Sequence, residues 1–574
     1  MKCKADFWEY AYIAGFFAAC WLWLFLAVPY HISFKEQTGV FLMNSGFIAS
    51  YLLKPGAVAS LAGDFLTQFF WFKPVGPVIT VLCLILLWAV TRKALGKCGM
   101  TKGIHILSLL PVAVEMAFIT YLNYPLSCTT GIIAAVSLAW LCMHLSDRHG
   151  SVIPFFLAMP FVYPAVGAHM VTFLLLFCIY FRRRPVAAAA GILAGTGIML
   201  VEGYLYNLSL TGTLVYPVIP GYKLPALALL ALSPASIPAA AILSSLKSRS
   251  WISIITASVS LFLAIYLNYG YTEEYMIEME TNACRGQWEK VWDMAEDAPD
   301  SYFYGTFYRN LCLARQDALP DRLLQYHQVP EGGMNVPINP GMDYLWAFSS
   351  IDQLLEVGDI PQATGCALLC QTIMPHSNSS QMLRRLAELA MIAGDNDVAL
   401  KYLDLLSRTI VHRRWADRKK SEIASGTLSK ELAAYREKSA AADRLFLQSD
   451  WYASLRNLAE CNPSDRTAAD YLMCSLLLGK KTQSFIAAFD RHYLGKDVKV
   501  PELYYEALLS NVHDEESFTD TVRKYGIPAA IANRYMEFLK AGGESDGNFE
   551  QLEEFKGTYW YYLVTTHLST NVRI

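Results

Sequence analysis

The chain has 574 residues, of which 54% are hydrophobic and 17% charged, and its formal net charge is −3. These averages describe neither half, because residues 1–268 hold 16 Lys/Arg and 7 Asp/Glu whereas residues 269–574 hold 31 and 43. The second part is acidic, which argues against nucleic-acid binding, since that requires clustered basic side chains. The composition predicts an all-α protein with a polytopic transmembrane domain over 1–268 and a soluble helical domain over 269–574.

Apolar stretches in the first part predict about nine membrane-spanning helices. They are expected near 7–28, 74–91, 104–121, 130–145, 152–164, 165–181, 186–203, 224–246 and 251–268. The first span should remain as a signal anchor, because no small-residue cleavage site follows it. Three prolines and Gly167 interrupt the run from 152 to 181, so a short broken hairpin is expected there instead of a single span.

The distribution of basic residues favours one orientation of these spans. With the N-terminus inside, twelve Lys/Arg fall in the predicted inner segments and only Lys35, Lys54, Lys73 and Lys223 in the outer ones. This excess follows the positive-inside rule. We therefore expect a multi-pass protein of the cell inner membrane, with a cytoplasmic N-terminus and a periplasmic C-terminal domain.

The first outer loop, residues 29–73, has an unusual composition for a loop. The stretch Gly39–Leu53 is apolar but too short to cross a bilayer, and Ala57–Phe72 places apolar residues at roughly helical spacing. Two interfacial or re-entrant helices, joined at Lys54-Pro55-Gly56, explain this pattern.

The C-terminal part reads as successive helix pairs. Gly358 is followed by small residues at Ala363 and Ala367, and Gly394 is followed by Ala399 in a similar arrangement. These offsets resemble the tetratricopeptide repeat, in which small residues let paired helices approach each other closely. The resemblance implies a helical stack with an extended surface for binding another protein.

Three ionisable residues within the predicted spans are functional candidates, because a charge in the bilayer is costly. Glu115 lies near the middle of the third span, and His169 and Glu202 lie towards the outer ends of theirs. A carboxylate in the position of Glu115 must be protonated, paired or facing water. The alternative for all three is a structural hydrogen bond that ties helices together.

The first outer loop holds a second group of candidates, because Glu36 and Asp64 are acidic residues among apolar neighbours. A loop of this kind after the first span, with an outer soluble domain at the C-terminus, is similar to the layout of GT-C membrane glycosyltransferases. The resemblance implies that Glu36 or Asp64 acts as catalytic base or metal ligand towards a lipid-phosphate sugar donor. The chain departs from that class in lacking its paired acidic motif, and residues 36 and 64 are too far apart to form one local motif.

The loop and the end of the chain carry a closer resemblance. The pattern comprises Glu36-Gln37, Pro55-Gly56, the run from Asp64 to Phe70 followed by Pro74, and the terminal stretch from Gly557 to Tyr562. In these residues the chain is similar to an uncharacterised family of polytopic proteins found mainly in Bacteroidetes, DUF6057, over nearly its whole length. The resemblance implies a membrane location and no established activity.

Two hypotheses for the function follow. The first is a cell-envelope protein whose helical-repeat domain binds or organises partner proteins outside the membrane. The alternative is a GT-C-like glycosyltransferase that uses a lipid-linked sugar at the outer membrane interface. Neither needs a nucleic acid, and no cofactor or metal is expected, because hydrolase elbows, phosphate-binding loops and HExxH zinc motifs are all missing from the sequence.

Overall fold

The computed structural model describes residues 2–100, 103–216, 226–245, 250–266, 271–300, 302–330, 333–335, 344–374, 378–439, 450–544 and 549–566. Within these ranges the chain is helical and contains no strand, in agreement with the predicted all-α class. It divides into two compact units. Unit 1 comprises 1–277, 374–383 and 403–418, and unit 2 comprises 278–373, 384–402 and 419–574. The domain boundary predicted at residue 268 lies outside the described residues.

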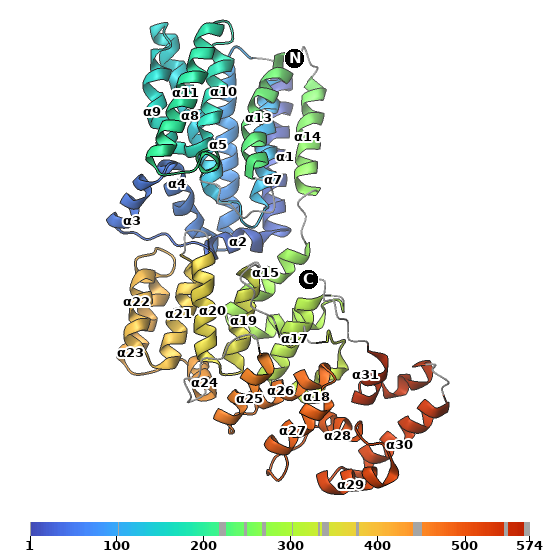
Figure 1. Ribbon diagram of the computed structural model, residues 1–574. Coiled ribbons are helices and arrows are strands. Elements are labelled where there is room, and N and C mark those ends of the chain that lie inside the picture. Colours follow the sequence, from blue (N-terminus) through green and yellow to red (C-terminus); the bar gives the residue numbers. More distant parts are fainter. Residues whose placement is uncertain are drawn as a thin grey trace. The chain divides into compact units, whose positions relative to one another are not determined.

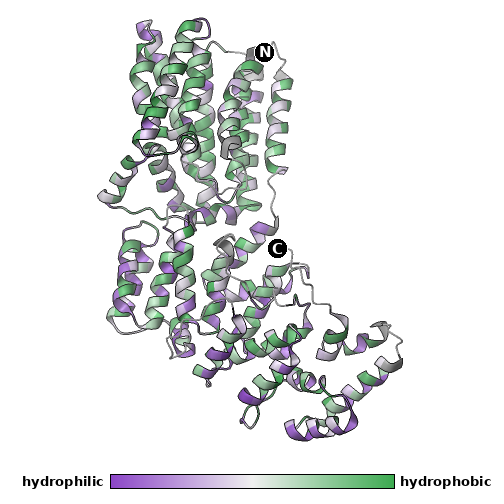
Figure 2. Ribbon diagram, viewed as in Figure 1, coloured by the Kyte–Doolittle hydropathy of each residue, from purple (hydrophilic) through white to green (hydrophobic). Residues whose placement is uncertain are grey.

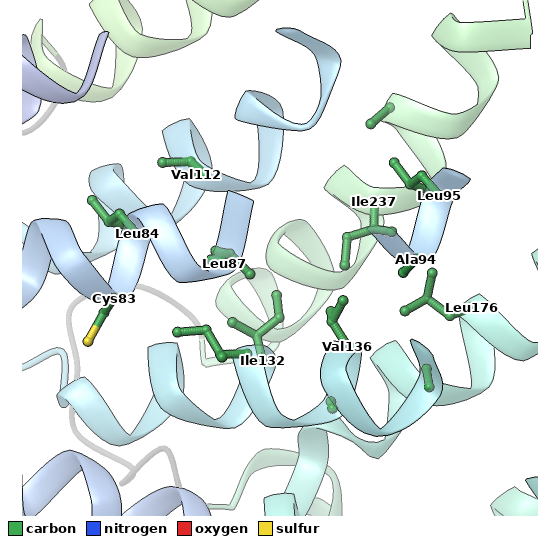
Figure 3. Packing of buried hydrophobic residues seen from close by; sticks show 14 of the residues in the cluster. Cys83, Leu84, Leu87, Ala94, Leu95, Val112, Ile132, Val136, Leu176 and Ile237 are labelled. Carbon is green, nitrogen blue, oxygen red and sulfur yellow. The ribbon is translucent and has the colours of Figure 1, made fainter. Parts of the chain in front are cut away.

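Unit 1 is a bundle of apolar helices, coloured blue to green in Figure 1 and largely hydrophobic in Figure 2. Its long members are α1 (Lys2–Leu26), α5 (Val75–Lys97), α7 (Leu109–Ile119, after the short α6, Ile104–Leu107), α8 (Leu126–His149), α9 (Ile153–Val166), α10 (Met170–Tyr180), α11 (Pro185–Leu205), α13 (Ala226–Ser245) and α14 (Ser250–Tyr266). Buried aliphatic side chains of different helices pack together in the core, among them Leu87, Val112 and Ile132 (Figure 3).

Five segments of unit 1 are long and apolar enough to cross a membrane. Among the described residues they are Phe7–Leu26, Val75–Lys97, Leu126–His149, Ile153–Tyr180 and Pro185–Leu205. The apolar helices Ile104–Ile119, Ala231–Ser244 and Trp251–Tyr266 are shorter. The fold is thus compatible with a membrane protein, and the count of nine spans stays a prediction.

The segment Ile153–Tyr180 folds back on itself. The Phe155 ring, at the start of α9, lies 5.0 Å from that of Phe177 and 5.8 Å from that of Phe181, at the end of α10. The chain reverses at the 3-10 turn Gly167–His169, where Gly167 has a φ of 63°. The broken hairpin expected from the prolines is therefore present.

The loop 29–73 is helical almost throughout. It forms α2 (Pro29–Gln37), α3 (Ser45–Ser50) with the 3-10 turn Tyr51–Leu53, and α4 (Ala57–Thr67) with the 3-10 turn Gln68–Trp71. The two helices predicted on either side of Lys54-Pro55-Gly56 are present, whereas α2 was not predicted, because its polar residues interrupt any apolar period. In Figure 1, α2 runs across the end of the bundle.

Two glycines bring α4 close to its neighbours. Gly56 has a φ of 72°, and a Cβ there would lie 3.4 Å from the backbone nitrogen of Gly167. A Cβ on Gly63 would lie 2.4 Å from the backbone nitrogen of Ser127, in the first turn of α8. The α4 helix therefore packs backbone to backbone against α8, which fixes the position of Asp64 one residue further on.

Unit 2 consists of short helices, many in adjacent antiparallel pairs. The helices of the C-terminal part are α15 (Tyr271–Cys284), α16 (Trp288–Glu296), α17 (Phe303–Arg315), α18 (Leu319–Arg322), α19 (Tyr344–Glu356), α20 (Ile360–Ile373), α21 (Ser380–Ala393), α22 (Asn396–Ser407), α23 (Arg413–Ala424), α24 (Lys430–Lys438), α25 (Trp451–Cys461), α26 (Thr467–Leu478), α27 (Thr482–His492), α28 (Glu502–Leu509), α29 (Glu515–Tyr525), α30 (Ala529–Glu544) and α31 (Tyr559–Thr565). Gly358, with a φ of 81°, forms the turn between α19 and α20. Helix pairs are thus found where the sequence predicted them, and their identity as tetratricopeptide-like repeats stays a prediction.

The packing of α4 against α8 makes a prediction about Gly63. Although alanine in a helix interior is usually more stable than glycine by about 0.5–1 kcal/mol, Gly63→Ala should destabilise the protein by about 1–3 kcal/mol, because the added methyl meets backbone atoms. Gly197→Ala in α11 is the matched control, since no atom lies within 4 Å of its Cβ position. Thermal unfolding of both purified variants measures the difference. Equal unfolding temperatures would show that α4 does not pack this closely.

Candidate functional site

The loop 29–73 borders a cavity of about 280 Å³ within unit 1. Its lining comes from four parts of the chain: residues between 35 and 68, the α7–α8 turn at 122–127, Tyr216, and residues between 378 and 412. We call it the carboxylate cavity, because Glu36 and Asp64 both line it. Its size is near the lower end of the range for small-molecule sites, about 300 Å³.

Glu36, near the end of α2, is a buried carboxylate held on one side only. Its side chain is 4% exposed, and its Oε1 lies 2.7 Å from Nε2 of His412. Its Oε2 is buried and has no hydrogen-bond partner among the described residues. The His412 ring is fixed in turn by edge-on contact with Trp71, at 4.9 Å between centroids, and the His412 backbone N–H donates to Thr409 Oγ1. One oxygen of Glu36 is therefore left without a donor in the wall of the carboxylate cavity.

Asp64, on α4, is half-buried and is oriented by a phenol. The hydroxyl of Tyr51 donates to Asp64 Oδ2 over 2.8 Å. Burial and the Asp64 carboxylate raise the pKa of Tyr51 well above its ordinary value, so the phenol stays protonated as a donor. The Tyr51 ring packs edge-on against Phe47, which packs against Phe41, and all three line the same cavity.

The fold thus brings together two residues that the sequence placed 28 positions apart. Glu36 and Asp64 are too far apart in the sequence to form one local motif. They line one cavity because α4 packs against α8, and Lys35 ties α2 to the end of α7 and the turn that follows it.

A buried lysine anchors α2 beside Glu36. The Lys35 ammonium donates to the backbone carbonyls of Ile119 and Tyr124, each at 2.7 Å. It therefore caps the C-terminal end of α7, where helix carbonyls lack partners and a cation is favoured. Burial lowers the pKa of this lysine to about 7. From the sequence, Lys35 was predicted only to be one of the outer basic residues, because no local pattern indicates the carbonyls that it meets.

Two segments from the C-terminal part of the chain close the other side of the cavity. Ser379 Oγ donates to the carbonyl of Gln37 at 2.5 Å, and Ser380 Oγ donates to that of Glu36 at 3.1 Å. These are carbonyls at the end of α2, which have no partner within the helix. Residues 374–383 and 403–418 both belong to unit 1, and no short-range pattern in the sequence indicated it.

The opposite end of α2 is held by Glu274. This carboxylate accepts from the backbone N–H groups of Tyr30 (2.6 Å) and His31 (3.0 Å) and contacts the His31 ring. Burial opposes the charged form of His31, but hydrogen bonds to Glu273 and Glu274 outweigh it and raise the pKa of the imidazole. A carboxylate at the first turn of a helix also satisfies N–H groups that have no partner within the helix.

Glu115 lies elsewhere and serves a structural arrangement. It is fully buried on α7 and accepts hydrogen bonds from Tyr124 and Thr129, both at 2.9 Å, and from Ser233. These three hydroxyls belong to the α7–α8 turn, α8 and α13. The geometry is that of a carboxyl group tying helices together, the structural alternative considered from the sequence.

His169 and Glu202 do not line the carboxylate cavity. His169 is buried in the turn between α9 and α10, where its ring packs against Gly131, and neither ring nitrogen has a hydrogen-bond partner in the described part of the chain. Glu202, on α11, is half-buried. No group of three or more His, Cys, Asp or Glu side chains that could hold a metal ion occurs among the described residues.

The chain belongs to a family of unknown function, DUF6057, which matches residues 5–566. No curated protein matches the chain, and no solved structure does either. The family assignment agrees with the resemblance found in the loop and in the terminal residues, and it assigns no activity.

The raised pKa of His31 makes the stability of unit 1 depend on pH. The contribution of the His31–Glu274 contact is present in full below the ordinary imidazole pKa of about 6.5, and it is lost as the pH rises through the higher folded value. We expect His31→Gln to destabilise the protein by about 1–3 kcal/mol at pH 5.5 and by less at pH 9. Thermal unfolding across this range is the measurement, with exposed His513→Gln as control. A penalty that grows with pH would contradict the assignment.

The structural role of Glu115 predicts a graded response to substitution. Glu115→Ala leaves three buried hydroxyls without their acceptor, at a cost of about 1–3 kcal/mol for each group that stays unsatisfied. Glu115→Gln keeps one acceptor oxygen and should cost less. Unfolding temperatures of the two variants give the order, and a protein whose stability is unchanged by Glu115→Ala would exclude the structural role.

Proposed function

We propose that this member of the DUF6057 family is an integral membrane transferase whose reaction site is the carboxylate cavity. The observation that carries the proposal is that Glu36 and Asp64 line one cavity, where a buried oxygen of Glu36 has no partner. A buried carboxylate oxygen left unpaired costs free energy. Such a group is a candidate for a functional role.

The geometry suits general-base catalysis of group transfer. His412 holds Glu36 Oε1 and leaves Oε2 to accept a proton from an acceptor hydroxyl. In glycosyl transfer the acceptor oxygen bonds to the anomeric carbon while the bond from that carbon to the phosphate oxygen breaks. The lipid phosphate leaves, and Glu36 takes the proton of the acceptor. Asp64, oriented by Tyr51, stabilises the positive charge that develops on the sugar.

A lipid-linked sugar is the donor that we propose. The site lies in the loop after the first apolar helix and is lined by the turn between α7 and α8, which supports a donor whose head group lies at the membrane surface. The similarity of this layout to GT-C enzymes supports the same substrate class. The paired acidic motif of GT-C enzymes is absent. Glu36 and Asp64 would therefore have different catalytic roles from the acidic residues of that class.

The membrane location and orientation are part of the proposal. Four single apolar helices of sufficient length, Phe7–Leu26, Val75–Lys97, Leu126–His149 and Pro185–Leu205, support a multi-pass protein. The excess of Lys and Arg in the predicted inner segments supports a cytoplasmic N-terminus. We therefore place the protein in the inner membrane, with the carboxylate cavity on the periplasmic side.

The test is complementation of a deletion strain of the native host. We expect the strain to accumulate a lipid-linked saccharide, measured by mass spectrometry of lipid extracts, and the unmodified gene to remove it. Glu36→Gln or Asp64→Asn should fail to do so, with at least a hundredfold loss of turnover, because each removes a group that acts in the transition state. The control is Asp147→Asn, a carboxylate of unit 1 that pairs with Lys97 and does not line the cavity.

The outcome is decided by the accumulated lipid. Full complementation by both cavity variants, at normal protein levels, would contradict a transferase that uses these carboxylates. Loss of function with an unfolding temperature within about 2 °C of the unmodified protein would support it, because folding would then be intact.

A second candidate function is a scaffold whose helical C-terminal part binds or organises envelope proteins. The observation that favours it is the run of helix pairs in unit 2, since stacked helical repeats expose extended binding surfaces. Removal of the whole C-terminal part cannot separate the two functions, because that part also supplies His412 and the serines that cap α2. Point substitutions on the surface of unit 2 are needed instead.

Met536 and Leu539 of α30 are suitable positions, being 50% and 47% exposed. If the protein acts as a scaffold through this surface, the double variant Met536→Asp with Leu539→Asp should fail to complement while Glu36→Gln succeeds. The transferase proposal predicts the reverse pattern. Both variants are to be checked for normal membrane levels and unfolding temperature.

A further inference from the structure

The wall of the carboxylate cavity has an excess of hydrogen-bond acceptors. Three oxygen atoms of its lining residues are buried and lack a hydrogen-bond partner among the described residues: Glu36 Oε2, Gln68 Oε1 and Asn123 Oδ1. They come from α2, the turn after α4 and the α7–α8 turn, so three separate elements converge on the cavity. Native proteins leave few buried polar atoms unpaired, and a cluster of three requires an explanation.

Three donors that lie beside these oxygens in the wall are already engaged by the protein. The Lys35 ammonium donates to two backbone carbonyls, and the Tyr51 hydroxyl donates to Asp64. The amide nitrogen of Gln68 donates to the carbonyl of Phe65 at 2.8 Å, which turns its oxygen the other way. The groups left for a ligand at these positions are therefore oxygens, and two lining residues are carboxylic acids.

At these three oxygens the arrangement disfavours an anion and favours a group that donates hydrogen bonds. A phosphate placed against Glu36 and Asp64 would meet like charge and acceptors without protons. Hydroxyl groups would satisfy the three oxygens and remove the cost of leaving them unpaired. The rings of Phe41, Phe47 and Tyr51 supply the apolar part of the wall, as is usual in small-molecule sites.

A divalent cation is the rival occupant, because carboxylate and amide oxygens are also its ligands. Glu36 is already paired with His412, and Asp64 with Tyr51. The described residues contain no cluster of three acidic, His or Cys side chains that could hold such an ion. The neutral, hydroxyl-rich ligand therefore fits the wall better.

We infer that the carboxylate cavity binds an uncharged, hydroxyl-rich group the size of one sugar ring, and that the phosphate of a lipid-linked donor stays outside these oxygens, at the exposed Lys54. The inference rests on the proposed function for the link to a lipid donor. It adds which part of that donor is buried and which residues select it, namely Gln68 and Asn123, while Glu36 Oε2 accepts the hydroxyl of the acceptor.

The experiment compares three probes on the full-length protein in phosphatidylcholine nanodiscs: octyl glucoside below its micelle concentration, octyl phosphate and magnesium chloride. Binding is measured by the shift in unfolding temperature during titration. We expect octyl glucoside to bind saturably and at least tenfold more tightly than octyl phosphate, with no effect of magnesium. Asn123→Ala and Gln68→Ala should each weaken glucoside binding about two- to tenfold, the effect of one lost hydrogen bond.

The control variant is Gln483→Ala, in unit 2, which should leave glucoside binding unchanged. Tighter binding of octyl phosphate than of octyl glucoside, or stabilisation by magnesium that Glu36→Gln abolishes, would overturn the inference. If Asn123→Ala or Gln68→Ala fails to fold, the relative affinities of the three probes for the unmodified protein still test the inference. Lys54→Ala should weaken the binding of octyl phosphate and leave the binding of octyl glucoside unchanged.

The failure of this inference can be told apart from failure of the proposed function. Glucoside binding that depends on Asn123, together with full complementation by Glu36→Gln and Asp64→Asn, would leave a sugar-binding site without transferase activity. Loss of complementation by those variants, together with phosphate bound in preference to glucoside, would leave the transferase and overturn the assignment of the buried group.

Discussion

Glu36 lies in the wall of the carboxylate cavity because α2 is held at both ends by groups from distant parts of the chain. Glu274 satisfies N–H groups at its beginning, and Ser379 and Ser380 satisfy carbonyls at its end. Lys35 fixes one side of the helix to the end of α7. A nine-residue helix has little stability of its own, so these contacts determine its position and the direction of its carboxylate.

The remaining features of the site depend on the fixed position of α2. With α2 in place, Glu36 meets His412, and the chain that leaves α2 passes the cavity towards the aromatic residues Phe41 and Phe47. Asp64 reaches the same space from α4, whose packing against α8 is set by Gly63. Lys35 donates to backbone carbonyls and Tyr51 to Asp64, whereas buried oxygens of Glu36, Gln68 and Asn123 are left without a partner among the described residues. Because acceptors and not donors are left unpaired, these oxygens favour a ligand that donates hydrogen bonds.

The parts of the structure that the sequence could predict are those determined by short-range patterns. The apolar periodicity of 57–72 predicted α4, and the prolines of 152–164 predicted the broken hairpin. Glu36 and Asp64 were identified as candidates because they are polar residues in an apolar loop. The pairing of Glu36 with His412 spans 376 positions, and no local pattern marks a histidine in a charged segment as a partner for the loop 29–73.

The roles of Lys35 and Glu115 were open for the same physical reason. A buried lysine and a buried carboxyl group both need partners, but the sequence does not state which partners the fold supplies. In one case they are the carbonyls at a helix end, and in the other three hydroxyls from neighbouring helices. The segment that carries His412 belongs to unit 1, although it lies far along the chain, and no local pattern indicated this.

The most direct test of this account is an experimental structure of the full-length protein in a lipid nanodisc, examined at residues 29–73 and 403–418. The account predicts that Glu36 and His412 lie within hydrogen-bond distance and that Asp64 borders the same cavity. A structure in which residues 403–418 are displaced from α2, and Glu36 faces bulk water, would contradict it.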